Sequence, residues 1–335
     1  IILSASLLTD TLFLFLFILF LFSLLQYIKS GHVKWLFLLV LFISLATLVR
    51  SLSFYLLLIL LIGLVILRLW QRDNILKIIT LLVIFLTVSG ALLGSILQRN
   101  YQQYESIGLT SMTGTHLLGW VVPAVYQYSG RGSYQEGQKI AKERLALVLQ
   151  RDRLSLESLN SFERSSYKAN VGKDILLEFG FIDVLKAWTI GSVINILSPS
   201  VAFSPALRSL KNPSFYMTKG SGIIEKLFNY IKNSSGLLYL TILVVGFIVS
   251  VIFTTLALMG VFKMVSALPP ITITTLLLLV GYFLAITGPI IGVKYRLPIE
   301  PILTLFATYF LNRIDKKNII NYILHCLRLK GLGII

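Results

Sequence analysis

Long apolar runs dominate this sequence, and they restrict it to an integral membrane protein. The first run, TLFLFLFILFLFSLLQYI at 11–28, contains no charged residue, and a membrane-spanning helix needs about 20 mostly apolar residues. Over all 335 residues, 56% are hydrophobic and only 13% are charged, whereas soluble domains are about a quarter charged. The sequence therefore predicts an all-α protein of the membrane.

The charged residues are strongly biased toward the basic side, with 30 Lys and Arg against 14 Asp and Glu. Such an excess suits an anionic partner, and with this hydropathy lipid phosphate is favoured over nucleic acid. The single cysteine, Cys326, and three scattered histidines, His32, His116 and His325, exclude a disulfide framework and a zinc site at ligand spacing. We therefore predict membrane lipids as partners, no nucleic acid, no metal and no cofactor.

The positive-inside rule orients the first part of the chain, residues 1–97, as four transmembrane helices. Lys29 and Lys34 follow the first run, so its C-terminal end is predicted to be cytoplasmic and Asp10 to lie at the outer face. The next apolar run, 35–67, would rise about 50 Å as one helix, too long for a bilayer core of about 30 Å. We predict a hairpin with Arg50 at its outer turn, followed by a fourth span at 78–97.

Residues 98–236 are mostly polar and are predicted to form an external helical domain. Within it, the stretch 136–168 has the periodicity of a helical pair. The stretch 181–199 is apolar but contains Asp183 and Lys186, so we expect a helix that lies in the membrane interface. If 181–199 crossed the membrane instead, the orientation of everything after it would be reversed.

The remaining apolar runs predict three further spans within 237–311, at 237–262, 268–287 and 298–311. The total is about seven, followed by a cytoplasmic tail at 312–335 that contains Arg313, Lys316 and Lys317. This count places the loop GVKYRLPIEPIL, at 292–303, on the extracytoplasmic side of a multi-pass cell-membrane protein.

Basic residues collect at this predicted outer face, where the orientation rule disfavours them. They are Arg50, Arg99, Lys294 and Arg296, and Tyr295 lies between the last two. Arginine and lysine form short, charge-assisted hydrogen bonds to phosphate oxygens, so we predict that these five residues bind a phosphate. The KYRLP cluster is the most specific of these signals, because Pro298 and Pro301 stiffen the chain after it.

Simpler roles remain open for each residue. Arg50, Lys294 and Arg296 can extend to lipid headgroups without a ligand, and Arg99 can complement the end of its helix. Asp10 can cap the first helix, and Glu300 is best explained as a carboxylate at a helix start.

The segments LLTDTLFLFLFILFLF, LVRS, QRNY and KYRLPIEPILTLFA, in this order, resemble the polyprenyl-phosphate-sugar-dependent membrane glycosyltransferases of the GT-C class. Within that class the chain is most similar to glycosyltransferase family 39, which includes protein mannosyltransferases and aminoarabinose transferases. The resemblance implies transfer of a sugar from a dolichyl or undecaprenyl phosphate to a lipid, glycan or protein acceptor outside the cytoplasm. It also implies that Arg50, Arg99, Lys294 and Arg296 hold the carrier phosphate.

Transfer of this kind needs a base for the acceptor and charge stabilisation for the departing phosphate. The resemblance implies an acidic base in an external loop upstream of Ile1, so we expect that the chain lacks its true N-terminus. Asp10 is then a secondary catalytic candidate that orients the acceptor or donor sugar. Two alternatives stay open: a flippase or transporter of lipid-linked glycans, and a non-catalytic assembly subunit.

Overall fold

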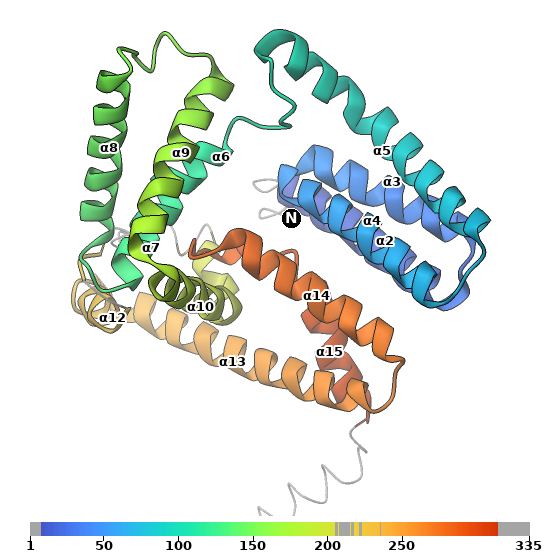
Figure 1. The fold of residues 1–335 in the computed structure, drawn as a ribbon. Coiled ribbons are helices and arrows are strands. Elements are labelled where there is room, and N and C mark those ends of the chain that lie inside the picture. Colours follow the sequence, from blue (N-terminus) through green and yellow to red (C-terminus); the bar gives the residue numbers. More distant parts are fainter. Residues whose placement is uncertain are drawn as a thin grey trace, which may run out of the picture.

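The computed structural model describes residues 8–204, 207, 215, 218–220, 223–234 and 236–313. Within these residues every regular element is a helix and none is a strand. Figure 1 shows a bundle of helices from the N-terminal part of the chain beside a second group of helices. The predicted all-α fold class is thus confirmed, whereas the predicted tail lies outside the described residues from 314 onward.

The N-terminal part of the chain forms a bundle of four helices: α2 (Leu8–Ser30), α3 (Val33–Val49), α4 (Phe54–Trp70) and α5 (Ile75–Tyr104). The predicted break in the 35–67 run is confirmed, because α3 ends before Arg50 and a 3-10 turn, η1 (Ser51–Ser53), precedes α4. The helix α5 is longer than predicted, and Figure 1 shows its C-terminal part extending past the rest of the bundle.

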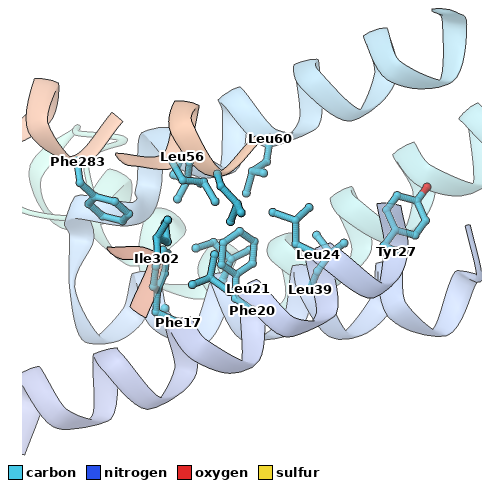
Figure 2. Packing of buried hydrophobic residues seen from close by; sticks show 14 of the residues in the cluster. Phe17, Phe20, Leu21, Leu24, Tyr27, Leu39, Leu56, Leu60, Phe283 and Ile302 are labelled. Carbon is cyan, nitrogen blue, oxygen red and sulfur yellow. The ribbon is translucent and has the colours of Figure 1, made fainter. Parts of the chain in front are cut away.

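A stripe of large apolar side chains on α2 forms the centre of this bundle. Phe13, Phe17, Phe20, Leu24 and Tyr27 recur every three or four residues and are all buried, so they lie along one face of the helix. Figure 2 shows several of them packed together with Leu39, Leu56 and Leu60 of α3 and α4. The ring of Phe17 meets that of Phe283 edge to face at a centroid distance of 5.2 Å. Phe283 belongs to α14 (Pro270–Thr287), so distant parts of the sequence share one core.

Five described helices are long and apolar enough to cross a membrane, which confirms several candidate spans but not the predicted count of about seven. They are Thr9–Ser30, Ser51–Trp70, Ile75–Tyr104, Leu237–Val265 and Pro270–Thr287. The two predicted spans that fall short are α3, with 17 residues, and α15 (Glu300–Arg313), with 14. At 1.5 Å per residue they rise about 26 and 21 Å, less than a bilayer core of about 30 Å.

More polar helices follow the bundle: α6 (Thr113–His116), a short π-helical turn η2 (Leu117–Val121), α7 (Val122–Tyr128), α8 (Tyr134–Arg151) and α9 (Ser161–Phe179). The predicted helical pair is confirmed as α8 and α9. Each begins with a capping box, Ser133 with Glu136 and Asn160 with Glu163, which satisfies free backbone N–H groups at the helix start. These helices share a second apolar core.

The helix α10 (Phe181–Leu197) lies where an interfacial helix was predicted. It is bent by 106° from α9, and Gly180 between them adopts φ +83°, a conformation that glycine accepts readily. Its buried face contacts the segment after α14: the Asn195 side chain donates to the Ile290 carbonyl at 2.9 Å and accepts from the Gly292 N–H at 2.8 Å. Its position at a membrane interface stays a prediction.

The C-terminal part contains two short 3-10 turns, η3 (Ser200–Phe203) and η4 (Val293–Tyr295), and the helices α12 (Ile223–Lys232), α13 (Leu237–Val265), α14 and α15. Figure 1 shows α15 lying against α13. A Cβ atom on Gly260 of α13 would overlap the backbone of Phe306 in α15, so this glycine lets the two helices meet at backbone contact. Through this packing η4 is held beside α10 and α13.

Candidate functional site

Asp10 and Arg50 form an ion pair at one end of the bundle. Asp10 lies in the first turn of α2 and is only 6% exposed, and Arg50 occupies the junction between α3 and η1. The guanidinium carbon of Arg50 also lies 5.7 Å from the ring centroid of Phe13, within range of a cation–π interaction. The structure therefore brings together two of the predicted site residues, and each neutralises the other.

Tyr295 connects this ion pair to the more polar helices. Burial raises the pKa of the Tyr295 phenol, and the positive charge of Arg50 offsets part of this rise. Tyr295 also packs against the second apolar core. It interacts electrostatically with Tyr134, whose pKa is likewise raised by burial. Tyr295 thus lies at the junction of the two helical groups, as a neutral phenol at physiological pH.

Lys294 is exposed, and its ammonium lies 5.1 Å from the centroid of the neighbouring Tyr295 ring. Partial burial, together with the positive charge of Lys294, lowers the pKa of the His116 imidazole. His116 remains open to solvent at the end of α6. A neutral imidazole and an exposed ammonium therefore face the same region as Tyr295.

Arg296 has a different environment from Lys294, although both belong to the same short segment. It is 3% exposed, and its Nη1 donates to the Ile196 carbonyl and to Ser250 Oγ, both at 2.5 Å. Its Nε lies 2.7 Å from Glu300 Oε1. Because Ser250 lies near the middle of α13, Arg296 is held beside the centre of that helix and does not share one site with Lys294.

An open groove of about 600 Å³ runs along α13 next to this pair. Its walls are mostly apolar side chains of η3 and α13, and its polar groups include Arg296, Glu300, Ser250 and two threonines. Its lining residues are Val201, Thr241, Ile242, Val245, Gly246, Val249, Ser250, Phe253, Arg296, Glu300 and Thr304. The groove can accommodate an apolar chain and has at one wall an ion pair of the buried Arg296 and the partly exposed Glu300.

Arg99 lies near the C-terminal end of α5, apart from the Asp10–Arg50 pair along the chain. Its guanidinium donates to Asn100 Oδ1 at 3.1 Å, and the Asn100 amide donates to the Gly108 carbonyl at 2.7 Å. These contacts fix the chain as it leaves α5. Arg99 lies before the last turn of α5, which contains no basic residue, so the structure does not support its expected role at the helix end. Among the described residues its side chain bonds Asn100 and none of the other predicted site residues.

Sequence reasoning did not identify three residues that contact the predicted site residues, namely Ser250, Tyr134 and Glu300. Ser250 and Tyr134 carry no signal in their local sequences, since only the packing of α13 and α8 brings them to the 292–296 segment. The pairing of Arg296 with Glu300 could have been found, because residues four apart face one another at a helix start. Glu300 does lie in the first turn of α15, as predicted, and it also neutralises Arg296.

The chemistry available here is that of cations, phenols and paired carboxylates. Among the described residues there is no group of three or more His, Cys, Asp or Glu side chains that could hold a metal ion. The Arg50 guanidinium is partly exposed beside its carboxylate partner, and Lys294 offers an exposed positive charge next to Tyr295 in the chain. An anion with a polar neighbour, such as a phosphate attached to a sugar, matches these groups.

No protein-family model, curated protein or solved structure matches this chain. The resemblance to glycosyltransferase family 39 therefore stays a prediction from the sequence motifs. A functional proposal has to rest on those motifs and on the contacts described above.

Proposed function

We propose that this chain belongs to a membrane glycosyltransferase that moves a hexose or pentose from a polyprenyl phosphate to a lipid, glycan or protein acceptor. Transfer would occur at the non-cytoplasmic face. The observation that carries the proposal is the convergence of Asp10, Arg50 and Tyr295, with the exposed Lys294 next in sequence. These residues come from the start of α2, the α3–η1 junction and η4.

The reaction requires that negative charge on the departing phosphate be stabilised as the glycosidic bond breaks. Arg50 supplies a guanidinium that is held in place by Asp10 and Phe13. When a carrier phosphate arrives, it can share or replace the carboxylate of Asp10 as the partner of Arg50, and Lys294 adds a second positive charge. Asp10 is then free to accept a hydrogen bond from a sugar hydroxyl.

The apolar groove beside α13 is compatible with this proposal, because it offers a surface for a polyprenyl chain; its lining includes Arg296 and Glu300 but not Asp10, Arg50, Lys294 or Tyr295. Its size, about 600 Å³, is within the usual range for ligand sites. In this proposal Arg296 and Glu300 shape the groove and hold η4 against α13. Arg296 therefore acts as a positioning residue, and Lys294 and Arg50 contact the phosphate.

The test is turnover by the full-length protein, reconstituted in liposomes, with a panel of polyprenyl-phosphate sugars. We expect transfer from at least one donor, and a Lys294→Met variant should raise the KM for that donor by about tenfold, as for the loss of one charged contact. The matched control is Lys139→Met, which removes an exposed lysine of α8. Transfer that is absent with every donor, or equal for Lys294→Met and the wild type, would contradict the proposal.

A transporter of lipid-linked glycans is the second candidate, and one observation favours it. The ion pair of Arg296 and Glu300 lies beside the middle of α13, and transporters often place charged residues within their helical bundles. Movement of a fluorescent lipid-linked glycan between leaflets, without chemical change, would favour this candidate. Impermeant labelling of a cysteine introduced at Lys294, in sealed and oriented membranes, tests the extracytoplasmic position that both candidates need.

A further inference from the structure

The short helix α12 has three distinct faces, although it is only ten residues long. One face is buried against the protein, a second exposes large apolar side chains, and a third carries charged groups. At 3.6 residues per turn the four exposed apolar residues are spaced by three, one and three positions, and so form one stripe. The stripe consists of Ile224, Leu227, Phe228 and Ile231.

The buried face fixes the rotation of α12 about its own axis. Lys226 is fully buried, and its Nζ donates to Gln127 Oε1 of α7 at 2.7 Å. Its ammonium lies 4.8 Å from the Phe215 ring centroid and 5.9 Å from that of Tyr134. Gln127 is itself held by a bond from its Nε2 to the Gly220 carbonyl at 3.1 Å. Because Lys226 points into the protein, the stripe has to point away from it.

The stripe is exposed far beyond what a soluble helix of this size tolerates. Ile224 is 82% exposed and Phe228 66%, and a contiguous apolar patch of this kind marks a surface that contacts a membrane or a protein partner. The remaining exposed positions, Glu225 and Lys232, lie together on one flank of the stripe, between it and the buried face of Lys226. The division into an apolar side and a charged side is that of a helix at a membrane surface.

The position of α12 identifies what covers the stripe. The helix ends at Lys232, and α13, one of the five candidate spans, begins at Leu237. The hydroxyl groups of Tyr230 and Tyr239 are hydrogen-bonded, which ties α12 to the first turn of α13. Leu237 is 83% exposed, so the apolar surface of the span begins immediately after the stripe. Tyrosines at such a junction are typical of the membrane–water boundary.

We propose that α12 is a membrane-surface helix whose apolar stripe is inserted between lipid headgroups next to the start of α13. Lys226 anchors the helix to α7, and Glu225 and Lys232 face water. This interaction surface differs from the helix at 181–199, for which an interfacial position was predicted from the sequence. The inference does not depend on the proposed catalytic function.

Site-directed spin labelling of the full chain in liposomes tests this proposal. Cys326 is first replaced by Ser, and a nitroxide is then attached at Phe228→Cys in the stripe or at Lys232→Cys on the charged edge. A third label at Val249→Cys, on the exposed face of α13, serves as the lipid-facing reference. All three side chains are exposed, so the substitutions leave the protein interior unchanged. Accessibility of each label to oxygen and to a water-soluble nickel chelate is measured.

We expect the ratio of oxygen to nickel accessibility at 228 to be several-fold higher than at 232 and to approach the value at 249. Brominated lipids should also quench a fluorophore at 228 more strongly than one at 232. Equal nickel accessibility at 228 and 232 would show a water-exposed stripe and overturn the proposal. A label at 228 shielded from both reagents would overturn it in favour of a protein partner.

Discussion

The two ends of the α2–α5 bundle each contain an arginine–carboxylate pair, but the pairs are built differently. At one end Arg68 bonds Asp73, five residues away, at 2.8 Å and also donates to the Tyr27 hydroxyl at 3.0 Å. Lys77 holds the second oxygen of Asp73 at 2.5 Å. At the other end Arg50 pairs with Asp10, which lies on another helix, and the side chain of Arg50 remains 22% exposed.

This difference separates a structural pair from a pair that can take part in binding. At the Arg68 end, both oxygens of Asp73 are bonded, one to Arg68 and one to Lys77, and the guanidinium also bonds the phenol of Tyr27. These contacts hold the turn between α4 and α5. At the Arg50 end, the guanidinium is in contact with solvent and next to η4, where Lys294 is exposed. The two pairs differ in the exposure of the arginine, which is 22% for Arg50 and 9% for Arg68, and not in that of the carboxylate, which is largely buried in both. A partner from solvent can therefore reach Arg50 more easily than Arg68.

The largest expected effect is on activity at the Arg50 end. We expect Arg50→Ala to lower the rate of sugar transfer by about 100-fold or more, as for loss of one preorganised charge donor. Arg50→Lys should recover only part of the rate, because an ammonium cannot form the bidentate contact. The measurement is the initial rate with a polyprenyl-phosphate sugar, normalised to folded protein. A rate equal to the wild type would assign Arg50 to the same structural class as Arg68.

The matched change at the other end should affect stability. We expect Arg68→Ala to lower the melting temperature by several degrees, because it leaves Asp73 and Tyr27 without a shared partner. The transfer rate per folded molecule should stay near the wild-type value. Differential scanning fluorimetry in detergent measures the first quantity. A large fall in kcat without a change in melting temperature would reverse the roles given to the two ends.

A change of pH between 7 and 10 should alter the charge of the buried lysine of α12, Lys226, but not the charge of the arginine in either pair. Arginines stay charged between pH 7 and 10, whereas burial lowers the pKa of Lys226 to about 7 from an unfolded value near 10.4. The undocked form therefore binds more protons across this range, so docking of α12 should strengthen as the pH rises, by at most about 1.4 kcal/mol per pH unit. Below pH 7 the effect should level off, because both forms are then protonated.

The mobility of a spin label at Lys232→Cys measures this docking. We expect the label to become less mobile from pH 7 to 10 in the wild-type background and to show no such trend with Lys226→Met. Tyr134, whose ring faces the ammonium, stays neutral here because burial raises its pKa. An identical pH profile in both backgrounds would remove Lys226 as the titrating group.

The smallest effect is expected at the rim of the Arg68 network. Lys77 is exposed and pairs with Asp73 across one helical turn, and pairs of this kind contribute little to stability. Lys77→Met should therefore leave the melting temperature and the transfer rate unchanged within error. A fall in melting temperature as large as that of Arg68→Ala would show that Lys77 is needed to stabilise the contacts of Arg68 with Asp73 and Tyr27.

The sequence predicted the elements of the fold better than the contacts between them. The break at Arg50 followed from the length of a 33-residue apolar run, and the helical pair α8 and α9 followed from periodicity. The predicted count of about seven spans exceeds the five described helices that are long enough to cross a membrane. The sequence of α15 is apolar enough to suggest a span, but its helix starts only at Glu300, after Pro298. Hydropathy does not report where a helix begins.

Site residues were predictable by type but not by partner. Arg50 and Asp10 were expected at the same face, and their ion pair depends on how α2 packs against the α3–η1 junction. Lys294 and Arg296 looked equivalent in sequence, yet the turn of η4 leaves Lys294 exposed and directs Arg296 to Ser250. Such differences arise from tertiary packing, which a linear pattern does not contain.

The bend at Gly180 separates α9 and α10 into two helices with different packing partners. The helix α9 is part of the core of the polar helices. The helix α10 contacts the segment before η4 through Asn195, and it contacts the end of α14 through Trp188, whose Nε1 donates to the Ala285 carbonyl at 3.0 Å. The contacts of α10 with Ile290 and Gly292 are therefore one route by which a movement of α9 would reach the segment that carries Lys294. One glycine thus sets the angle between the core of the polar helices and the helix that contacts this segment.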